Sequence, residues 1–197
     1  MRAFLETDRL TLRPFRESDA DDVLALDSDP EVMRCLNGGE PTSREEVLRE
    51  KMPALLRHYP CLDGRAGVEG RGYWAAQDRS SGAFLGWFEF RPLRDDRCDE
   101  VELGYRLNRR AWGRGLATEG SRALIRLGFT ELGVLRVTAN TMTVNQRSRR
   151  VMEKAGLGYV RTFFEEWPDA IEGSEFGDVE YAVTRAEWLG GGAAPKD

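Results

Sequence analysis

The feature that most constrains this chain is a strand, a glycine-containing loop and a helix in direct succession. Residues 100–107 alternate apolar and polar side chains, as a half-buried strand does. Residues 116–129 repeat apolar side chains at helical spacing on one face. In the loop between them, Gly113 and Gly115 allow the backbone to turn tightly and to approach a ligand closely. A strand that leads directly into a helix in this way favours a mixed α/β fold.

The same kinds of pattern continue over most of the chain. Further strands are predicted at residues 10–15, 73–77, 83–90, 135–143, 159–164 and 179–184, further helices at 18–29, 43–59 and 145–155, and turns or loops at 60–71 and 91–99. Pro30 is expected to end the first of these helices, and Pro53 to kink or divide the second. With 197 residues and no internal repeat or convincing linker, we expect one domain over residues 1–189. The glycine-rich tail, residues 190–197, is expected to be disordered.

Charge and histidine content exclude several classes of protein. The formal net charge is −5, which argues against nucleic acid as a partner because phosphate binding requires a basic face. Since His58 is the one histidine, a two-histidine metal site is impossible. No apolar run approaches the roughly 18 residues of a membrane span, and the first residues lack the apolar stretch of a signal peptide. We therefore expect a cytoplasmic protein that binds no metal, nucleic acid or membrane.

The cysteines carry no obvious chemistry. Cys35, Cys61 and Cys98 cannot all pair within one chain, and their spacing fits neither a metal site nor a redox CxxC motif. We therefore expect them to be reduced thiols with a structural role.

The glycine loop has the properties of an anion site. The first N–H groups of the following helix have no partners within that helix, and the helix dipole favours a negative charge there. Arg110 and Arg114 add positive charge, so that a pyrophosphate would fit. The loop lacks the Gly-Lys-Ser/Thr ending of a P-loop, and Thr118 stands where a dinucleotide fingerprint has its third glycine. By itself the pattern is equally compatible with a glycine turn that binds nothing.

Several motifs together resemble those of the GCN5-related N-acetyltransferase (GNAT) superfamily, and of its RimJ/RimL-like branch in particular. The matching segments are residues 7–14, 102–107, 145–157 and 178–188 and the pattern Arg110-x-x-Gly113-x-Gly115. They follow one another in the family's order and span roughly residues 5–189. The resemblance implies an α/β (α+β) GNAT fold. Such a fold has a mixed, mostly antiparallel twisted sheet of six to seven strands, about four flanking helices, and two splayed central strands.

The resemblance also implies how the cofactor binds. Acetyl-CoA serves as the acyl donor, without a metal, and its pantetheine arm pairs with backbone groups between the splayed strands. The corresponding cofactor residues in this sequence are Tyr105, Arg106, Leu107, Arg110, Gly113, Arg114, Gly115, Leu116, Ala117, Asn145 and Ser148. Asn145 is equally suited to be the N-cap of its helix, and Ser148 to be a small residue on the helix's buried stripe.

Proton transfer decides which residues are catalytic candidates. An alkyl amine with a pKa of about 10.4 is mostly protonated at neutral pH, and only its neutral form attacks a thioester. Glu102 is the first candidate for the base, although it is equally compatible with a solvated or ion-paired strand carboxylate. Glu100, on the same strand face, could share the role, and Glu89 is the third candidate. Met152 stands near the position where many family members have a tyrosine acid, so Ser148 is the candidate acid.

The acceptor is left open by the sequence. A protein N-terminal amine and a small-molecule amine are both compatible with the resemblance, and residues 30–72 and 163–178 are expected to set the specificity. The alternatives are a CoA-binding regulatory module without catalysis and an acyltransferase that uses a longer acyl-CoA. A homodimer is expected only from the general prevalence of twofold assemblies.

Overall fold

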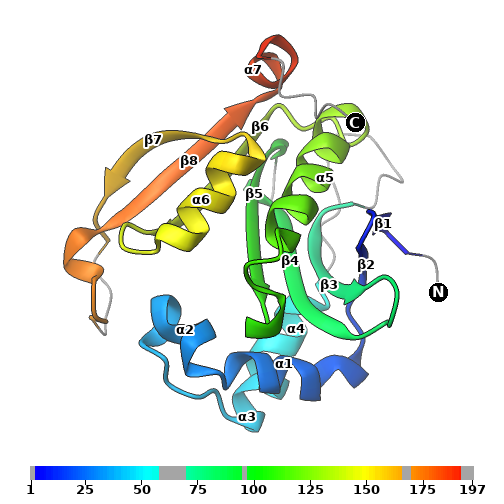
Figure 1. The fold of residues 1–197 in the computed structure, drawn as a ribbon, viewed down its shortest axis with the longest axis vertical. Coiled ribbons are helices and arrows are strands. Elements are labelled where there is room, and N and C mark those ends of the chain that lie inside the picture. Colours follow the sequence, from blue (N-terminus) through cyan, green and yellow to red (C-terminus); the bar gives the residue numbers. More distant parts are fainter. Residues whose placement is uncertain (1–2, 58–69, 95–96, 166–169, 192–197) are drawn as a thin grey trace.

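A single twisted sheet organises the molecule. The computed structural model describes residues 3–57, 70–94, 97–165 and 170–191. Its 8-stranded sheet has the order β1-β2-β3-β4-β5-β6-β8-β7, as Figure 1 shows. The strands are β1 (Leu5–Glu6), β2 (Leu10–Pro14), β3 (Gly72–Asp78), β4 (Phe84–Arg94), β5 (Arg97–Leu107), β6 (Arg136–Met142), β7 (Gly158–Phe163) and β8 (Asp178–Thr184). Neighbouring strands are antiparallel except β5 and β6, which are parallel. The mixed, mostly antiparallel α/β sheet is confirmed, and β1 adds one strand beyond those predicted.

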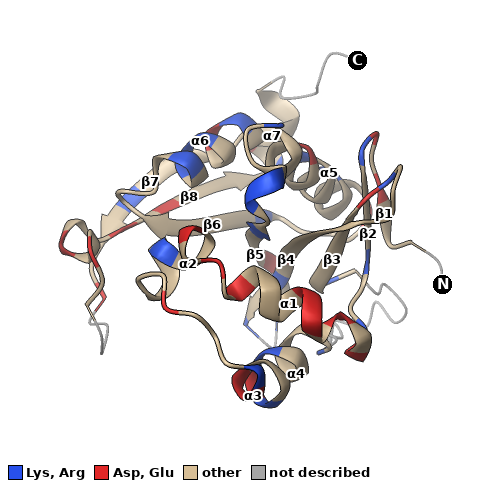
Figure 2. Cartoon of the chain, turned by 60° about the horizontal axis from the view of Figure 1, so that its bottom comes forward, with Lys and Arg blue, Asp and Glu red and all other residues tan. Residues whose placement is uncertain are grey.

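Helices cover both faces of this sheet. They are α1 (Ala20–Asp27), α2 (Pro30–Asn37), α3 (Arg44–Glu46), α4 (Met52–Leu55), α5 (Leu116–Thr130), α6 (Gln146–Ala155) and α7 (Arg185–Gly190). Figure 2 shows α5 and α6 on one side of the sheet, with α1, α3 and α4 on the other. α7 extends to Gly190, and residues 192–197 of the expected tail lie outside the described residues. In the part of the chain that the structure describes, no helix is long and apolar enough to cross a membrane.

The two prolines in the first half behave differently. The first helix ends before Pro30 as predicted, since α1 stops at Asp27, but Pro30 also begins α2, which was not predicted. Asp29 caps this second helix by accepting a hydrogen bond from the Glu31 N–H at 3.0 Å. Proline suits this first position because its missing N–H would have no partner within the helix. Pro53 interrupts its helix as predicted, since a π-helical turn (Val47–Lys51) separates α3 from α4.

The hairpin of β4 and β5 is longer than predicted. Residues 91–99 were expected to be turn-like, but β4 continues to Arg94 and β5 begins at Arg97. Charged side chains line the extension: Arg97 contacts Asp99 along β5 at 2.6 Å, and Arg91 of β4 reaches across to Glu102 of β5. High charge alone was therefore a poor guide to the end of these strands.

A hydrophobic core lies on each face of the sheet. The larger core packs α5 and α6 against the central strands, and the smaller core packs α1 and α4 against β3 and β4. In the larger core, Gly120 and Gly128 of α5 lie against the rings of Phe88 and Phe90 on β4. A Cβ atom at Gly120 would lie 2.3 Å from the Phe88 ring, so glycine permits this close approach of helix and sheet.

The cysteines differ from one another. Cys35 is a free thiol, as expected, and burial raises its pKa. Cys98 is disulfide-bonded, so the prediction of a reduced thiol is wrong there. Cys61 and His58 lie outside the described residues.

Candidate active site

The glycine loop has the backbone of an anion site. Gly113 and Gly115 have φ values of 71° and 77°, which are in the left-handed region that favours glycine. Gly115 is the N-cap of α5, and no side chain caps the helix there. The N–H groups of Leu116 and Ala117 therefore remain available for a ligand, at the positive end of the 15-residue helix.

The two arginines of the loop are partly committed to the protein itself. Arg110 donates through Nη2 to the carbonyl oxygen of Phe84 at 2.7 Å, which braces the loop against the start of β4. Arg114 lies 3.9 Å from a carboxylate oxygen of Asp78. Its carbonyl oxygen accepts a hydrogen bond from Arg9 Nη1 at 2.8 Å. The structure thus brings both residues to the loop, but it turns the guanidinium of Arg110 toward the sheet.

The parallel strands β5 and β6 separate at the predicted place. Their pairing covers three positions and stops at Glu102 opposite Thr138. β5 then continues unpaired on this side to Leu107, and β6 to Met142. The gap leads toward the glycine loop, which follows β5, and the strand backbone along it has no strand partner on this side.

Alternation along β5 determines which backbone groups face this gap. The Asn108 N–H donates to the carbonyl oxygen of Leu85 on β4 at 2.8 Å. Because bonded pairs alternate along an antiparallel ladder, Arg106 also bonds toward β4, whereas Tyr105 and Leu107 direct their N–H and C=O groups toward β6. Two of the three predicted pantetheine residues therefore face the gap, and Arg106 does not.

Arg106 instead links the sheet to the helices of the first half. Its Nη1 lies 2.6 Å from a carboxylate oxygen of Asp27 in α1, and its guanidinium lies 4.9 Å from the ring centroid of Trp87. The second oxygen of Asp27 lies 3.2 Å from Lys51 Nζ. The Arg106 side chain therefore holds α1 in place and does not face a ligand.

A pair of hydroxyl groups spans the gap. The Tyr105 hydroxyl on β5 donates to the carbonyl oxygen of Ser148 on α6 at 3.0 Å and lies 2.9 Å from Ser148 Oγ. Burial raises the pKa of Tyr105, so its hydroxyl stays protonated. Asn145 is the N-cap of α6, since its Oδ1 accepts from the Ser148 N–H at 3.2 Å, and its Nδ2 donates to Thr141. The structure thus brings Tyr105, Asn145 and Ser148 together.

Glu89 and Glu102, two of the three candidate carboxylates, lie side by side on the face of the sheet opposite to α6. Arg91 contacts Glu89 through Nε and Glu102 through Nη2, the latter at 2.6 Å. The Tyr73 hydroxyl donates to Glu89 at 3.3 Å. The third candidate, Glu100, is separate, because it pairs with Arg136 where β5 and β6 are still bonded to each other.

Glu89 has the most distinctive environment of the three. Its side chain lies across Gly104, where a Cβ atom would be 2.7 Å from the Glu89 carboxylate, and it is 12% exposed. Burial, and then the neighbouring charge of Glu102, raise the pKa of Glu89, while Arg91 opposes the shift. Gly104 precedes Tyr105 on β5, so this carboxylate lies next to the gap from the other side of the sheet.

Three side chains at the site were missed by the sequence interpretation. Arg91 was assigned to a turn, although Glu89 and Arg91 alternate on β4 as residues of one strand face do. Trp112 lies within the loop, and Arg147 of α6 covers its ring. Residues 166–169, within the 163–178 segment expected to set specificity, lie outside the described residues.

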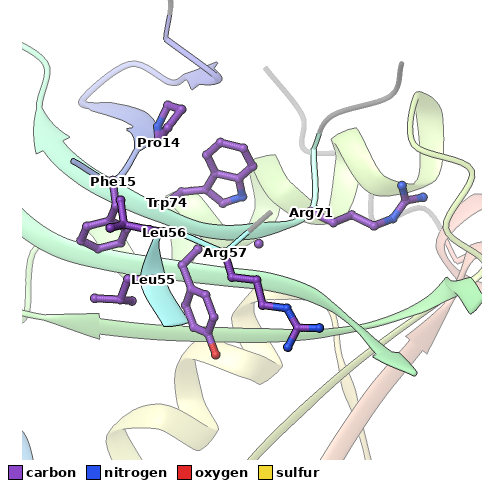
Figure 3. A pocket seen from close by; sticks show the side chains of 9 residues that line it. Pro14, Phe15, Leu55, Leu56, Arg57, Arg71 and Trp74 are labelled. Carbon is purple, nitrogen blue, oxygen red and sulfur yellow. The ribbon is translucent and has the colours of Figure 1, made fainter. Parts of the chain in front are cut away.

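Two hollows of the described surface border this site. Figure 3 shows a recess of about 10 Å³ between β2, β3 and α4, next to Trp74 and Arg57, with room for about one water molecule. A groove of about 990 Å³ crosses the outer side of α5, and Gly115 lines one part of it. Within the described residues, no group of three or more His, Cys, Asp or Glu side chains is arranged to hold a metal ion.

Comparison with known proteins gives this geometry a context. A sequence model of the acetyltransferase (GNAT) domain matches residues 9–158. The FsC-acetyl coenzyme A-N(2)-transacetylase of Aspergillus fumigatus is 36% identical over 191 residues, which cover 94% of this chain and 77% of that protein.

Solved structures share the fold at lower identity. The spermidine N-acetyltransferase from Vibrio cholerae, in complex with CoA and spermine, has a TM-score of 0.72 and 15% identity, and the match covers 93% of this chain and 99% of that chain. RimL, a ribosomal L7/L12 alpha-N-protein acetyltransferase in complex with CoA, has a TM-score of 0.71 and 17% identity. The match covers 93% of this chain and 98% of that chain. At these identities the two structures show a common fold.

Proposed function

The chain belongs to the GNAT acetyltransferase family, and we propose that it transfers the acetyl group of acetyl-CoA to a primary amine by direct attack. The family match and the curated relative make it an acetyl-CoA-dependent N-acetyltransferase. The amine, the order of proton transfers and the residues that carry them are our proposal.

The separation of β5 and β6 after Glu102 and Thr138 is the observation that supports this function best. Tyr105 and Leu107 offer strand-edge N–H and C=O groups there, which suit the amide groups of a pantetheine arm. The uncapped start of α5 lies at the end of the same strand, where a pyrophosphate would bind. Acetyl-CoA would therefore lie along the gap, with its phosphates at Gly113 and Gly115.

The base in this proposal belongs to the pair Glu89 and Glu102. The neutral amine nitrogen attacks the thioester carbonyl carbon, and the tetrahedral intermediate passes an amine proton to the carboxylate as the C–S bond breaks. Glu89 is the favoured member, because it is buried over Gly104 and its raised pKa brings it closer to the working pH of a base. Glu102 raises the pKa of Glu89 and Arg91 lowers it. Glu100 forms an ion pair with Arg136 instead.

The leaving thiolate is stabilised on the other side of the gap. Ser148 lies on α6 with its hydroxyl beside that of Tyr105. A thiol with a pKa of about 8.5 leaves readily, so a single hydroxyl donor is sufficient assistance. In this proposal the Ser148 hydroxyl donates a hydrogen bond to the sulfur, Tyr105 orients that hydroxyl, and CoA leaves as a thiolate that takes its proton from solvent.

For the acceptor we favour a small molecule with a primary amine. The support is the 36% identical relative, whose name states transfer to an N(2) nitrogen, and whose sequence matches 94% of this chain. A protein N-terminal amine, as for RimL, is the second candidate, supported by the fold alone.

The test is thiol release from acetyl-CoA with a panel of small amines and N-terminal peptides, measured against controls without an acceptor. We expect release with a small amine. Glu89→Gln should lower kcat by about 100-fold or more, in line with loss of a general base, and Glu102→Gln should lower it less. Glu100→Gln is the matched control on the same strand face and should change kcat little.

Other outcomes would select the alternatives. Calorimetric binding of acetyl-CoA without turnover of any amine would indicate a CoA-binding module without catalysis. Faster turnover with a longer acyl-CoA would indicate a different acyltransferase. Absence of binding to any acyl-CoA would overturn the proposal.

A further inference from the structure

Trp112 and Arg147 form a contact across the mouth of the gap between β5 and β6. Trp112 lies in the glycine loop, where its Nε1 donates to the carbonyl oxygen of Leu107 at 2.7 Å. Arg147 belongs to the first turn of α6, and its guanidinium carbon lies 5.0 Å from the centroid of the Trp112 ring. The indole is therefore fixed from the strand side and presents one face to a cation from the opposite helix.

The positive charges around the loop are unequally available. Arg110 is bonded to the carbonyl oxygen of Phe84, Arg109 lies 3.8 Å from Asp29, and Arg114 lies 3.9 Å from Asp78. Within the described residues, Arg147 has no carboxylate within 4.0 Å, and its side chain is exposed. Figure 2 shows Lys and Arg along α6, on the opposite side of the sheet from the acidic residues of α1. Arg147 is thus a cation beside the loop whose charge no carboxylate offsets.

We propose that Arg147 binds a phosphate group of acetyl-CoA, with Trp112 holding its guanidinium in place beside the loop. This inference rests on the proposed function, since it assigns a residue to the cofactor site. Arginine suits the task because its planar fork binds two phosphate oxygens at once and also stacks on an aromatic face. Arg147 supplies at the loop the charge that Arg110 directs toward the sheet.

The role of Trp112 follows from its two contacts. Its hydrogen bond to Leu107 fixes the plane of the ring, and the ring then limits the positions that the guanidinium can take. Less side-chain freedom is lost when the phosphate binds, so the affinity is higher than an unrestrained arginine would give.

Binding of CoA, dephospho-CoA and pantetheine to the full chain, measured by calorimetry, tests the assignment. We expect Arg147→Ala to raise the Kd for CoA about tenfold, as loss of a charge-assisted contact does, and to leave the Kd for pantetheine unchanged. Arg147→Glu should raise the Kd for CoA further. Arg150→Ala is the matched control, because it removes an exposed arginine from the same helix, and it should bind CoA like the wild type.

The dephospho-CoA arm identifies the phosphate. A variant effect that persists with dephospho-CoA assigns Arg147 to the pyrophosphate, and an effect that disappears assigns it to the 3′-phosphate. Equal Kd values of wild type and Arg147→Ala for CoA would overturn the proposal, as would an equal loss for pantetheine. Binding of CoA by the wild type tests the proposed function separately, so the two failures are distinguishable.

Discussion

At the scale of single residues, the environment of Glu89 determines the chemistry of the site. Its carboxylate is buried across Gly104, shares Arg91 with Glu102 and accepts a hydrogen bond from Tyr73. The sequence interpretation placed Glu102 first, because only Glu102 stands within a recognisable motif. The importance of Glu89 depends on the register that sets it opposite Gly104, and the spacing of residues along the chain does not contain that register.

The pH dependence of the reaction should report this carboxylate. Burial and Glu102 raise the pKa of Glu89, so its active, ionised form is lost at a higher pH than for an ordinary glutamate, whose pKa is 4.5. Because Arg91 lowers this pKa, Arg91→Gln should move the acidic limb of kcat/KM to a higher pH. Rates over about pH 5 to 9 would measure the limb, with Glu100→Gln as the unshifted control. A limb that Arg91→Gln leaves in place would argue against Glu89 as the base.

The hydroxyl pair gives a second prediction at this scale. Tyr105→Phe retains the ring but removes the group that holds Ser148, so kcat should fall about tenfold with little change in the KM for acetyl-CoA. Ser148→Ala should have a similar effect. Since the two residues act as a unit, the double variant should be little slower than either single variant. Steady-state rates of the three proteins decide this, and strictly additive losses would show that the hydroxyls act independently.

At the scale of elements, periodicity predicted most of the fold. α5, α6 and β2 were found within one or two residues of the observed ends, because each has a clear apolar stripe or alternation. β1 and the ends of β4 and β5 were missed, since their stability comes from cross-strand partners rather than from local pattern. The separation of β5 and β6 came from the family resemblance, because periodicity does not show where paired strands part.

The packing of α5 on the sheet makes a prediction for Gly120. Alanine is the better helix former by about 1 kcal/mol, but a Cβ atom here would meet the Phe88 ring at 2.3 Å. We expect Gly120→Ala to lower the free energy of unfolding by about 1–3 kcal/mol through overpacking. Urea unfolding measures this, with Gly190→Ala as a control, since a Cβ atom at Gly190 would meet nothing within 4 Å. A Gly120→Ala protein as stable as the control would show that Phe88 moves aside without cost.

At the scale of the whole molecule, Asp27 connects parts that are far apart in the sequence. Its side chain is 1% exposed, and its two oxygens contact Arg106 of β5 at 2.6 Å and Lys51 of the π-helical turn at 3.2 Å. One carboxylate thereby holds α1 and the Val47–Lys51 turn against the strand that borders the gap. The sequence interpretation assigned Arg106 to the cofactor and no role to Asp27 or Lys51, because the proximity of the three residues exists only in the folded chain.

Removal of this carboxylate should loosen the helical layer from the sheet. Asp27→Ala removes the carboxylate that Arg106 contacts and leaves Lys51 with Glu46, at 3.3 Å, and we expect a loss of about 2–4 kcal/mol in the free energy of unfolding. This is somewhat below the value for fully buried pairs, because Arg106 and Lys51 remain 16% and 24% exposed. Asp21→Ala removes a carboxylate of the same helix from its ion pair with Arg44. The side chains of Arg44 and Asp21 are 61% and 76% exposed, so this change should lower the free energy of unfolding by less than about 1 kcal/mol.

The contrast between the two variants tests whether the connection is specific. In urea unfolding, equal losses for Asp27→Ala and Asp21→Ala would mean that burial gives the Asp27 contacts no special weight. If the large loss is due to the stranded Arg106 cation, adding Arg106→Met to Asp27→Ala should recover part of the stability, since an apolar side chain of similar length does not need the carboxylate. Failure to recover any stability would instead indicate that Arg106 contributes mainly through its packing on Trp87.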